Sequence, residues 1–409
     1  MWRVILSRRM LVTFVMGFSC GLPLLLTLSV LQAWMTDEGV DLTVIGMMSL
    51  VGLPYTLKFL WAPALDRFTI LFLGRRRGWL LIAQLALVGA IIGLGLTHPG
   101  ENPWGVAFAA FLVTFFSASQ DIVVDAYRRE DLADEELGLG SSFYVNGYRV
   151  GMLLASGGGL IMADHMSFQA VYLIMAACML PGIITTLLTP EPRVAEGTPR
   201  TLAEAVINPL AEYFSRSGAW WILAFILFYK IGDTMASAMT MPFYLEVGFT
   251  KTQVGTVVKF FGFWATIIGG LAGGIIMLRL KINKSLWIFG FIQAISTACF
   301  AILTQTGPSI SVLAGVIAFE NLSGGMGTTA FVAFMASITN KKFTATQYAL
   351  LSSLMGIPRV FASAPTGYMA KHIGWEGFFI FCALAAIPGM LMLIKFAPWH
   401  SAGAETQPG

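Results

Sequence analysis

Long apolar runs recur along the whole chain and are separated by short polar segments. A run of about 18 or more apolar residues can cross a ~30 Å hydrocarbon core as a helix. The ~10-residue alternating segments of a membrane β-barrel do not occur. The runs therefore predict twelve transmembrane helices, at residues 10–35, 43–66, 78–97, 103–126, 139–163, 168–189, 218–245, 252–278, 285–306, 310–337, 345–370 and 375–396.

One polar connection, between the sixth and seventh runs, is much longer than the others. It contains four prolines, and its residues 202–214 have the pattern of a short amphipathic surface helix. Six helices, a linker and six more helices predict two related halves. We expect an N-terminal half at 1–189, a cytoplasmic linker at 190–217, a C-terminal half at 218–398 and a disordered tail at 399–409.

Composition agrees with a protein that lies in a lipid bilayer. Hydrophobic residues make up 56% of the chain and charged residues 11%, whereas soluble domains carry about 25% charged residues. A net charge of +3 gives no argument for a nucleic-acid partner. The four cysteines are far apart without metal-ligand spacing, so no metal or organic cofactor is expected.

The loops differ in their content of lysine and arginine. If the N-terminus is cytoplasmic, the cytoplasmic segments hold 18 of the 25 basic residues, and the opposite side holds two. Because cytoplasmic loops carry an excess of Lys and Arg, this distribution predicts that both termini are cytoplasmic.

We single out nine charged residues inside the predicted helices, because each needs a partner or a water-filled cavity there. The third, sixth, ninth and twelfth helices have no charge in their interiors, which indicates that the other eight surround a polar path. The nine are the basic Lys58, Arg149, Lys230, Lys259 and Arg359 and the acidic Asp121, Asp125, Asp233 and Glu320.

These charges suit a carrier of an anionic solute, since fixed cations offset the dehydration of carboxylate or phosphate. Asp121 and Glu320 are the leading candidates for a carboxyl group that binds and releases a proton. Asp125 could take part in the gate or could pair with a loop arginine. Asp233 follows Lys230 by three residues, which favours a structural pair.

The four histidines lie in loops or tails, and no Ser/His/Asp constellation is evident. We therefore expect a transporter and not an enzyme. A membrane enzyme that acts through its carboxylates on cell-wall precursors stays open as the alternative from another class.

The loop after the second helix reads Asp66-Arg67, then Gly74-Arg75-Arg76-Arg77. It resembles the loop signature of the major facilitator superfamily, in which these residues latch the cytoplasmic gate. The resemblance implies a twelve-helix, all-α membrane fold with two pseudo-twofold halves. It also implies that Asp66, Arg67, Arg75, Arg76 and Arg77 form a gate motif.

Further segments are similar to the AmpG muropeptide permease family. They are 17–23 (GFSCGLP), 31–35 (LQAWM), 58–63 (KFLWAP), 117–123 (SASQDIV), 147–153 (GYRVGML), 229–233 (YKIGD) and 319–328 (FENLSGGMGT). The resemblance implies proton-driven import of N-acetylglucosaminyl-1,6-anhydro-N-acetylmuramyl peptides across the Gram-negative inner membrane, linked to cell-wall recycling and β-lactamase induction.

The family's functionally sensitive positions match Gly21, Ala118 and Gln120, and its proton-linked aspartates match Asp121 and Asp125. Together with Glu320, these aspartates are the predicted proton-coupling residues. The predicted substrate-binding residues are Lys58, Arg149, Lys230, Lys259, Arg359, Gln120, Gln32, Trp34, Asn146 and Asn321. We expect a monomer that carries a small sugar-peptide, and a major facilitator protein for another anionic solute, such as a peptide or an acyl-CoA, stays open as the alternative.

Overall fold

The computed structural model describes residues 5–70, 73–192, 202–216, 218–250, 253–362, 365–397 and 399. All the regular elements of this described part are helices. They form two compact units, one made of Met1–Ala211 with Ala336–Ser353 and the other of Glu212–Met335 with Leu354–Gly409. Most of the predicted tail 399–409 and of the linker between Pro192 and Leu202 lies outside the described residues, as does the side chain of Arg359.

The first unit contains the helices of the first six predicted spans. They are α2 (Arg8–Leu25), η1 (Leu26–Val30), α3 (Leu31–Asp37), α4 (Leu42–Met47), η2 (Met48–Gly52), α5 (Leu53–Leu57), η3 (Lys58–Leu60), α6 (Ala62–Arg67), α7 (Arg75–Gly95), α8 (Pro103–Asp131), α9 (Leu137–Leu153), η4 (Leu154–Gly158), α10 (Gly159–Ala163), α11 (Phe168–Ala177) and α12 (Leu180–Leu188).

The second unit contains most of the remaining helices. They are α14 (Ala219–Phe228), α15 (Ile231–Val247), η5 (Val254–Phe261), α17 (Gly262–Ala298), α18 (Phe300–Thr306), α19 (Ile310–Ile338), α21 (Gly356–Phe361), α22 (Thr366–Ala385) and α23 (Ile387–Phe396). The surface helix α13 (Leu202–Ser215) is present where the amphipathic pattern predicts it.

The helices lie where the hydrophobic pattern predicts them, and most ends agree within a few residues. The helix α19 covers 310–338 against a prediction of 310–337, but α8 continues five residues past the predicted end at 126. Non-helical backbone at Lys281 (φ 60°) and Gly374 (φ 69°) falls between predicted spans. Among the described residues, eight stretches are long and apolar enough to cross a membrane, and one of them, Val254–Thr306, covers two predicted spans. The count of twelve and the orientation of the termini stay predictions.

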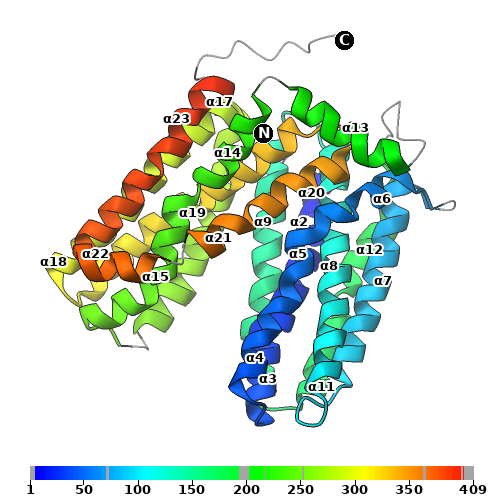
Figure 1. Cartoon of the computed structure of the whole chain (residues 1–409), viewed down its shortest axis with the longest axis horizontal. Helices are drawn as coiled ribbons and strands as arrows, with labels where there is room; N and C mark the ends of the chain where they lie inside the picture. Colours follow the sequence, from blue (N-terminus) through cyan, green and yellow to red (C-terminus); the bar gives the residue numbers. More distant parts are fainter. Residues whose placement is uncertain are drawn as a thin grey trace. The chain divides into compact units, whose positions relative to one another are not determined.

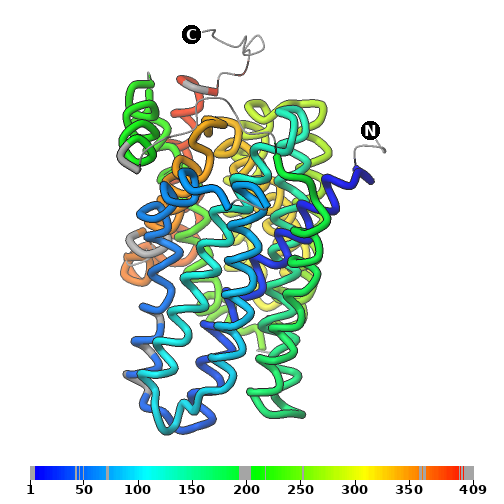
Figure 2. Tube along the Cα trace, turned by 90° about the vertical axis from the view of Figure 1, so that its right-hand side faces the viewer, coloured from blue at the N-terminus to red at the C-terminus, as the bar shows by residue number. Residues whose placement is uncertain are grey.

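In the first unit, α2 and α9 cross at backbone contact. A Cβ atom built on Gly21 would lie 2.0 Å from the carbonyl oxygen of Tyr148, and one built on Gly151 would lie 2.3 Å from that of Phe18. Only glycine permits so close an approach, as at other small-residue helix crossings in membranes. The helices α7 and α8 also run side by side in both views (Figure 1, Figure 2).

The segment Ala336–Ser353 belongs to the first unit although it is far from that unit in sequence. It holds the end of α19 and nearly all of α20 (Thr344–Leu354). The Gln347 amide donates to the carbonyl oxygen of Pro209 on α13 at 3.1 Å, and α20 lies near α6 at one end of the unit (Figure 1). The predicted division at residues 189 and 218 stays a prediction.

Large apolar side chains are exposed on both units, among them Trp104, Phe108, Phe260 and Leu391. So much apolar surface is typical of a protein that contacts lipid and not water. Inside the second unit, rings of Phe243, Phe300 and Phe379 pack together. The fold thus places apolar groups outside and inside, and polar side chains gather in a few buried clusters.

Candidate functional site

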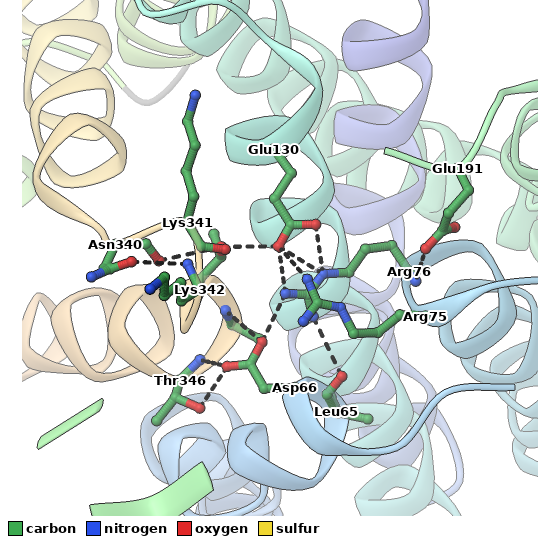
Figure 3. A network of polar contacts seen from close by, with 12 residues as sticks. Leu65, Asp66, Arg75, Arg76, Glu130, Glu191, Asn340, Lys341, Lys342 and Thr346 are labelled. Carbon is green, nitrogen blue, oxygen red and sulfur yellow. Dashed lines mark hydrogen bonds and ion pairs between the residues drawn. The ribbon is translucent and has the colours of Figure 1, made fainter. Parts of the chain in front are cut away.

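Asp66 lies at the centre of the first polar cluster, which we call the Asp66 network (Figure 3). Its buried carboxylate accepts hydrogen bonds from the backbone N–H of Ala345 (3.3 Å) and Thr346 (2.8 Å) and from the Thr346 hydroxyl (2.7 Å). These donors belong to the first turn of α20, whose N–H groups have no partners within the helix. A negative charge is stabilised at this end of the helix by its dipole. The carboxylate of Asp66 therefore caps α20.

Arg76 of the gate motif links Asp66 to Glu130 at the end of α8, and Arg75 adds a second bond to Glu130. Arg76 Nη2 lies 2.7 Å from Asp66 Oδ1 and 2.6 Å from Glu130 Oε1, and Arg75 Nη2 lies 3.1 Å from the same Glu130 oxygen. Glu130 also accepts from the Thr344 hydroxyl at 2.9 Å. Three elements, α6, α7 and α8, thereby hold the start of α20 through buried, charge-assisted bonds.

The start of α7 is held from the other side by Glu191. Its carboxylate accepts from the backbone N–H of Arg76 (2.7 Å) and of Arg77 (2.9 Å). Arg77 donates to the carbonyl oxygens that end α12, at Thr186 (3.1 Å) and Leu187 (2.8 Å). Arg67 differs from the other motif residues, since its guanidinium lies over the Phe68 ring at 5.6 Å. The structure thus brings together four of the five predicted gate residues.

A second cluster surrounds Asp125 on α8, and we call it the Asp125 cluster. Arg128 Nη2 lies 3.2 Å from Asp125 Oδ1, and Lys58 Nζ lies 4.0 Å from Oδ2. Arg128 also donates to the hydroxyls of Ser141 (2.6 Å) and Tyr348 (3.0 Å). All the charged members are less than a tenth exposed. Asp125 thus pairs with an arginine as anticipated, but Arg128 belongs to the last turns of α8 and not to a loop.

Asp121 lies one turn before Asp125 and has fewer partners. Its Oδ1 atom is buried without a hydrogen-bond partner in the described part of the chain, and the same holds for Gln120 Oε1 and both polar atoms of the Asn146 amide. The Gln120 amide nitrogen contacts Cys20 Sγ at 3.5 Å. Buried polar atoms without partners carry a desolvation cost. These positions are therefore suited to a proton, a water molecule or a polar group of a solute.

A third cluster, the Glu320 cluster, lies within the second unit. Lys230 Nζ is 3.1 Å from both Asp233 Oδ2 and Gln293 Oε1. The Ser296 hydroxyl donates to Glu320 Oε2 at 2.6 Å, and the Glu320 and Asp233 carboxyls are close enough to share a hydrogen bond. The expected pair of Lys230 and Asp233 is thus present and touches the candidate Glu320.

Other predicted binding residues lie outside these clusters. Trp34 is buried, stacks on Phe168 at 5.6 Å and donates weakly to Glu38 (3.4 Å), so its ring packs in the apolar core. The Asn321 amide accepts from the Thr266 hydroxyl at 2.7 Å and links two helices.

Three further residues that are predicted to bind the solute are half-buried or exposed. Gln32 and Arg149 are half-buried, and Lys259 is exposed on η5. The contact of these residues and of Trp34 with a solute stays a prediction. Gly21 acts at the crossing of α2 and α9, and Ala118 is fully buried on α8.

The sequence patterns missed the residues that complete each cluster. The apolar pattern places Glu130 and Arg128 in a loop because apolar character ends near 126, although the spacing of Asp125 and Arg128 is that of a helical ion pair. Glu191 stands between two prolines, and nothing in that pattern indicated its bond to α7. The predicted helix 285–306 carries no charge, so the charge pattern does not single out Gln293 and Ser296.

Comparisons with known proteins agree with this fold. The profile of the Major Facilitator Superfamily matches residues 9–363. The anhydromuropeptide permease of Escherichia coli K12 is 45% identical over 394 residues, which cover 96% of this chain and 80% of that protein. An uncharacterised protein of Haemophilus influenzae is 42% identical (98% and 97% covered), and the putative transporter AmpG 4 of Rickettsia felis is 33% identical (94% and 96% covered).

Solved structures share the fold at low sequence identity. The proton:xylose symporter XylE has a TM-score of 0.73 at 11% identity, with 95% of both chains covered. The Escherichia coli fucose:proton symporter FucP has a TM-score of 0.72 at 12% identity, with 94% and 97% covered. The fold and the relatives are those of multi-pass membrane transporters, not enzymes. The chain belongs to the AmpG muropeptide permease family of the major facilitator superfamily.

Proposed function

We propose that this protein imports anhydromuropeptides from the periplasm into the cytoplasm and uses the proton gradient as its energy source. The observation that carries the substrate class is the 45% identity, across nearly the whole chain, to a protein named anhydromuropeptide permease. Such sugar-peptides carry several carboxylates. The buried cation Lys58 and the half-buried cation Lys230 are suited to a solute of this kind.

Proton coupling is proposed on the chemistry of the buried carboxyls. Within the described part of the chain, Asp121 has a carboxyl oxygen with no donor, and a proton there would satisfy that atom. Asp125 shares Lys58 with it, and Glu320 lies in the corresponding cluster of the second unit. We assign Asp121 as the main proton acceptor, with Asp125 and Glu320 as coupled groups.

The proposal includes the topology and the place of action. Twelve helices in two six-helix halves, with both termini cytoplasmic, follow from the loop charges. Alternating access of the two halves then requires the bonds of the Asp66 network to α20 to form and break in each cycle. We place the protein, as a monomer, in the Gram-negative inner membrane, where import would supply wall recycling and influence β-lactamase induction.

Uptake of labelled anhydromuropeptide into vesicles that contain the purified protein tests the function. We expect uptake that rises with an imposed inward pH gradient and falls to the gradient-free level with an uncoupler. No uptake in either condition would exclude this substrate, and uptake indifferent to the uncoupler would exclude proton coupling. Uptake of a labelled short peptide or acyl-CoA, together with no uptake of muropeptide, would favour a different anionic solute.

A further inference from the structure

Arg128 connects an acid of the proposed proton path to a helix that is distant in the sequence. Its guanidinium bonds to Asp125 on the same helix (3.2 Å) and to the Tyr348 hydroxyl on α20 (3.0 Å). Its Nε atom is buried without a hydrogen-bond partner in the described residues. Arg128 is 2% exposed, so α20 forms part of the cover that excludes water from this cation.

The surroundings of Arg128 hold few groups that could replace Asp125. Its remaining contacts are the Ser141 hydroxyl (2.6 Å) and the rings of Tyr144 and Tyr348, with centroids at 4.7 and 5.6 Å. Cation–π contacts and neutral hydroxyls stabilise a cation much less than a carboxylate does. Within the described part of the chain, Asp125 is the carboxylate in contact with Arg128.

Among the charged residues described for this cluster, positive and negative charges balance only when both aspartates are ionised. Two cations, Lys58 and Arg128, stand against two acids, Asp121 and Asp125. The groups that act electrostatically on Asp125 or are affected by it are Lys58, Arg128, Asp121, Cys20, Tyr144, Tyr148 and Tyr348. Among these groups, Asp121 is the one other carboxyl, and it lies one helical turn further from Arg128. The remaining groups are a lysine, a cysteine and three tyrosines, which do not replace the charge of Asp125.

We propose that Arg128 is a positioning residue that links the charge of Asp125 to the closure of α20 over the end of α8. While Asp125 is ionised, Arg128 is neutralised and stays buried beneath α20. When Asp125 takes up a proton, Arg128 becomes a buried cation without its partner, a strongly unfavourable state. Departure of α20 then admits water to the guanidinium and relieves that cost.

This inference rests on the proposed function for its role in transport, since it couples protonation of the carrier to release of α20. Its physical content is independent of the solute. The direction also fits symport, because protonation from the periplasmic side would favour opening at the end where α20 leaves α8. The neighbouring pair of Arg129 and Asp134 offers a contrast, because Asp134 is largely solvent-exposed.

Hydrogen–deuterium exchange of the α20 amides in the solute-free, full-length protein tests the link at one fixed pH. Asp125→Asn imitates the protonated acid, and we expect it to speed exchange across Thr344–Tyr348 by at least about tenfold, as expected for loss of a buried charge partner. In an Arg128→Gln background, Asp125→Asn should change the exchange rate by less than about twofold, because the guanidinium that would lose its partner is no longer present. Asp134→Asn, which neutralises the partner of Arg129 instead, is the matched control and should also stay within about twofold.

A second measurement needs no substitution of Arg128, in case Arg128→Gln fails to fold. Phenylglyoxal labelling of the Arg128 guanidinium, read by peptide mass spectrometry, should become several-fold faster in Asp125→Asn than in the unaltered protein. Equal labelling of Arg128 in the two proteins would overturn the proposal. The proposal would also be overturned if Asp125→Asn still sped hydrogen exchange in the Arg128→Gln background but no longer did so in a Lys58→Gln background. Failure of muropeptide uptake alone would count against the proposed function and leave these outcomes unaffected.

Discussion

The Asp125 and Glu320 clusters contain similar side chains but differ in their balance of positive and negative charge. Each contains a lysine and two carboxyls on neighbouring turns or helices. In the first unit, Arg128 adds a second cation, so the cluster is neutral with both acids ionised. In the described part of the Glu320 cluster, Lys230 faces Asp233 and Glu320, and the carboxyl oxygens are bonded to Lys230 and Ser296. That cluster is neutral only when one carboxyl carries a proton.

This difference suggests that the two acid sites act differently during transport. A proton added to the Asp125 cluster leaves an excess positive charge and creates a driving force for rearrangement. A proton in the Glu320 cluster removes excess negative charge and is consistent with a resting state. We therefore expect the first unit to respond most to the proton gradient, and the following substitutions test this contrast.

The largest effect is expected for Asp121→Asn. Asparagine keeps the shape of the side chain but cannot bind and release a proton, so gradient-driven accumulation should fall by at least about tenfold, to the level without a gradient. Solute binding, measured by calorimetry, and solute exchange at equal pH should remain measurable. Accumulation that still follows the pH gradient would remove Asp121 from the coupling mechanism.

The second expected effect concerns the helix crossings beside the two clusters. Gly21 lies next to Cys20 in the first unit, and a Cβ added to it would lie 2.0 Å from the carbonyl oxygen of Tyr148. Gly232 lies next to Asp233 in the second unit, and a Cβ added to it would lie 2.0 Å from the carbonyl oxygen of Cys382. Overpacking of this kind costs about 1–3 kcal/mol. Gly21→Ala and Gly232→Ala should therefore each lower the thermal midpoint in detergent.

Gly89→Ala provides the control for both glycines, since Gly89 has no neighbouring atom within 4 Å of an added Cβ. It should leave the midpoint unchanged or raise it slightly, because alanine favours a helix more than glycine does. If only Gly21→Ala destabilised the protein, the crossing in the second unit would be more adaptable than its geometry indicates.

A smaller effect is expected for Glu320→Gln. Glutamine keeps an oxygen that can accept from Ser296 and imitates the neutral state of the cluster. Uptake should fall only a few-fold, because replacing a charge-assisted bond by a neutral one costs about 1 kcal/mol, and it should still respond to the pH gradient. Glu320→Ala is the matched comparison and should be worse because Ser296 then loses its acceptor. Loss of the gradient response in Glu320→Gln would make Glu320 a proton-cycling residue equal to Asp121.

The sequence predicted the helices and many of the charged residues because both follow from local properties. Lipid leaves no partner for a free backbone group, so an apolar run of sufficient length must be a helix. A charge inside such a run must find a partner, which drew attention to Lys58, Asp125 and Glu320. Neither argument needs the three-dimensional arrangement.

The partners of these charges could not be predicted because they come from distant parts of the chain. The apolar pattern places Arg128 in a loop, yet it lies in α8 and is covered by Tyr348, which comes 220 residues later. The surroundings of Trp34 are equally unpredictable from the sequence, although its contact with a solute stays a prediction. In the structure, Phe168 and Tyr172 enclose its ring, which no local pattern indicates.

The smallest expected effect is that of Asp134→Asn, at the exposed edge of the contact between α8 and the segment before α20. Burial opposes ionisation of Asp134, but the hydrogen bond and charge of Arg129 (2.7 Å) and the charge of Lys341 (3.7 Å) hold the pKa of this carboxyl below its usual 3.8. A lowered pKa means that the ionised pair stabilises the folded protein above pH 3.8 and that this contribution is lost as the pH falls below it.

Because Asp134 is mostly exposed, solvent screens the pair and its contribution should be about 0.2–1 kcal/mol. Asp134→Asn should lower the thermal midpoint slightly at neutral pH and low salt, with a smaller difference in high salt. The difference should shrink further as the pH falls through the lowered pKa. The contrary result is that Asp134→Asn destabilises the protein as much as Asp125→Asn does in the same buffer. That result would show that the exposed pair Arg129–Asp134 and the buried pair Arg128–Asp125 contribute equally to stability. Burial would then give no reason to assign the coupling of Asp125 to α20 to Arg128.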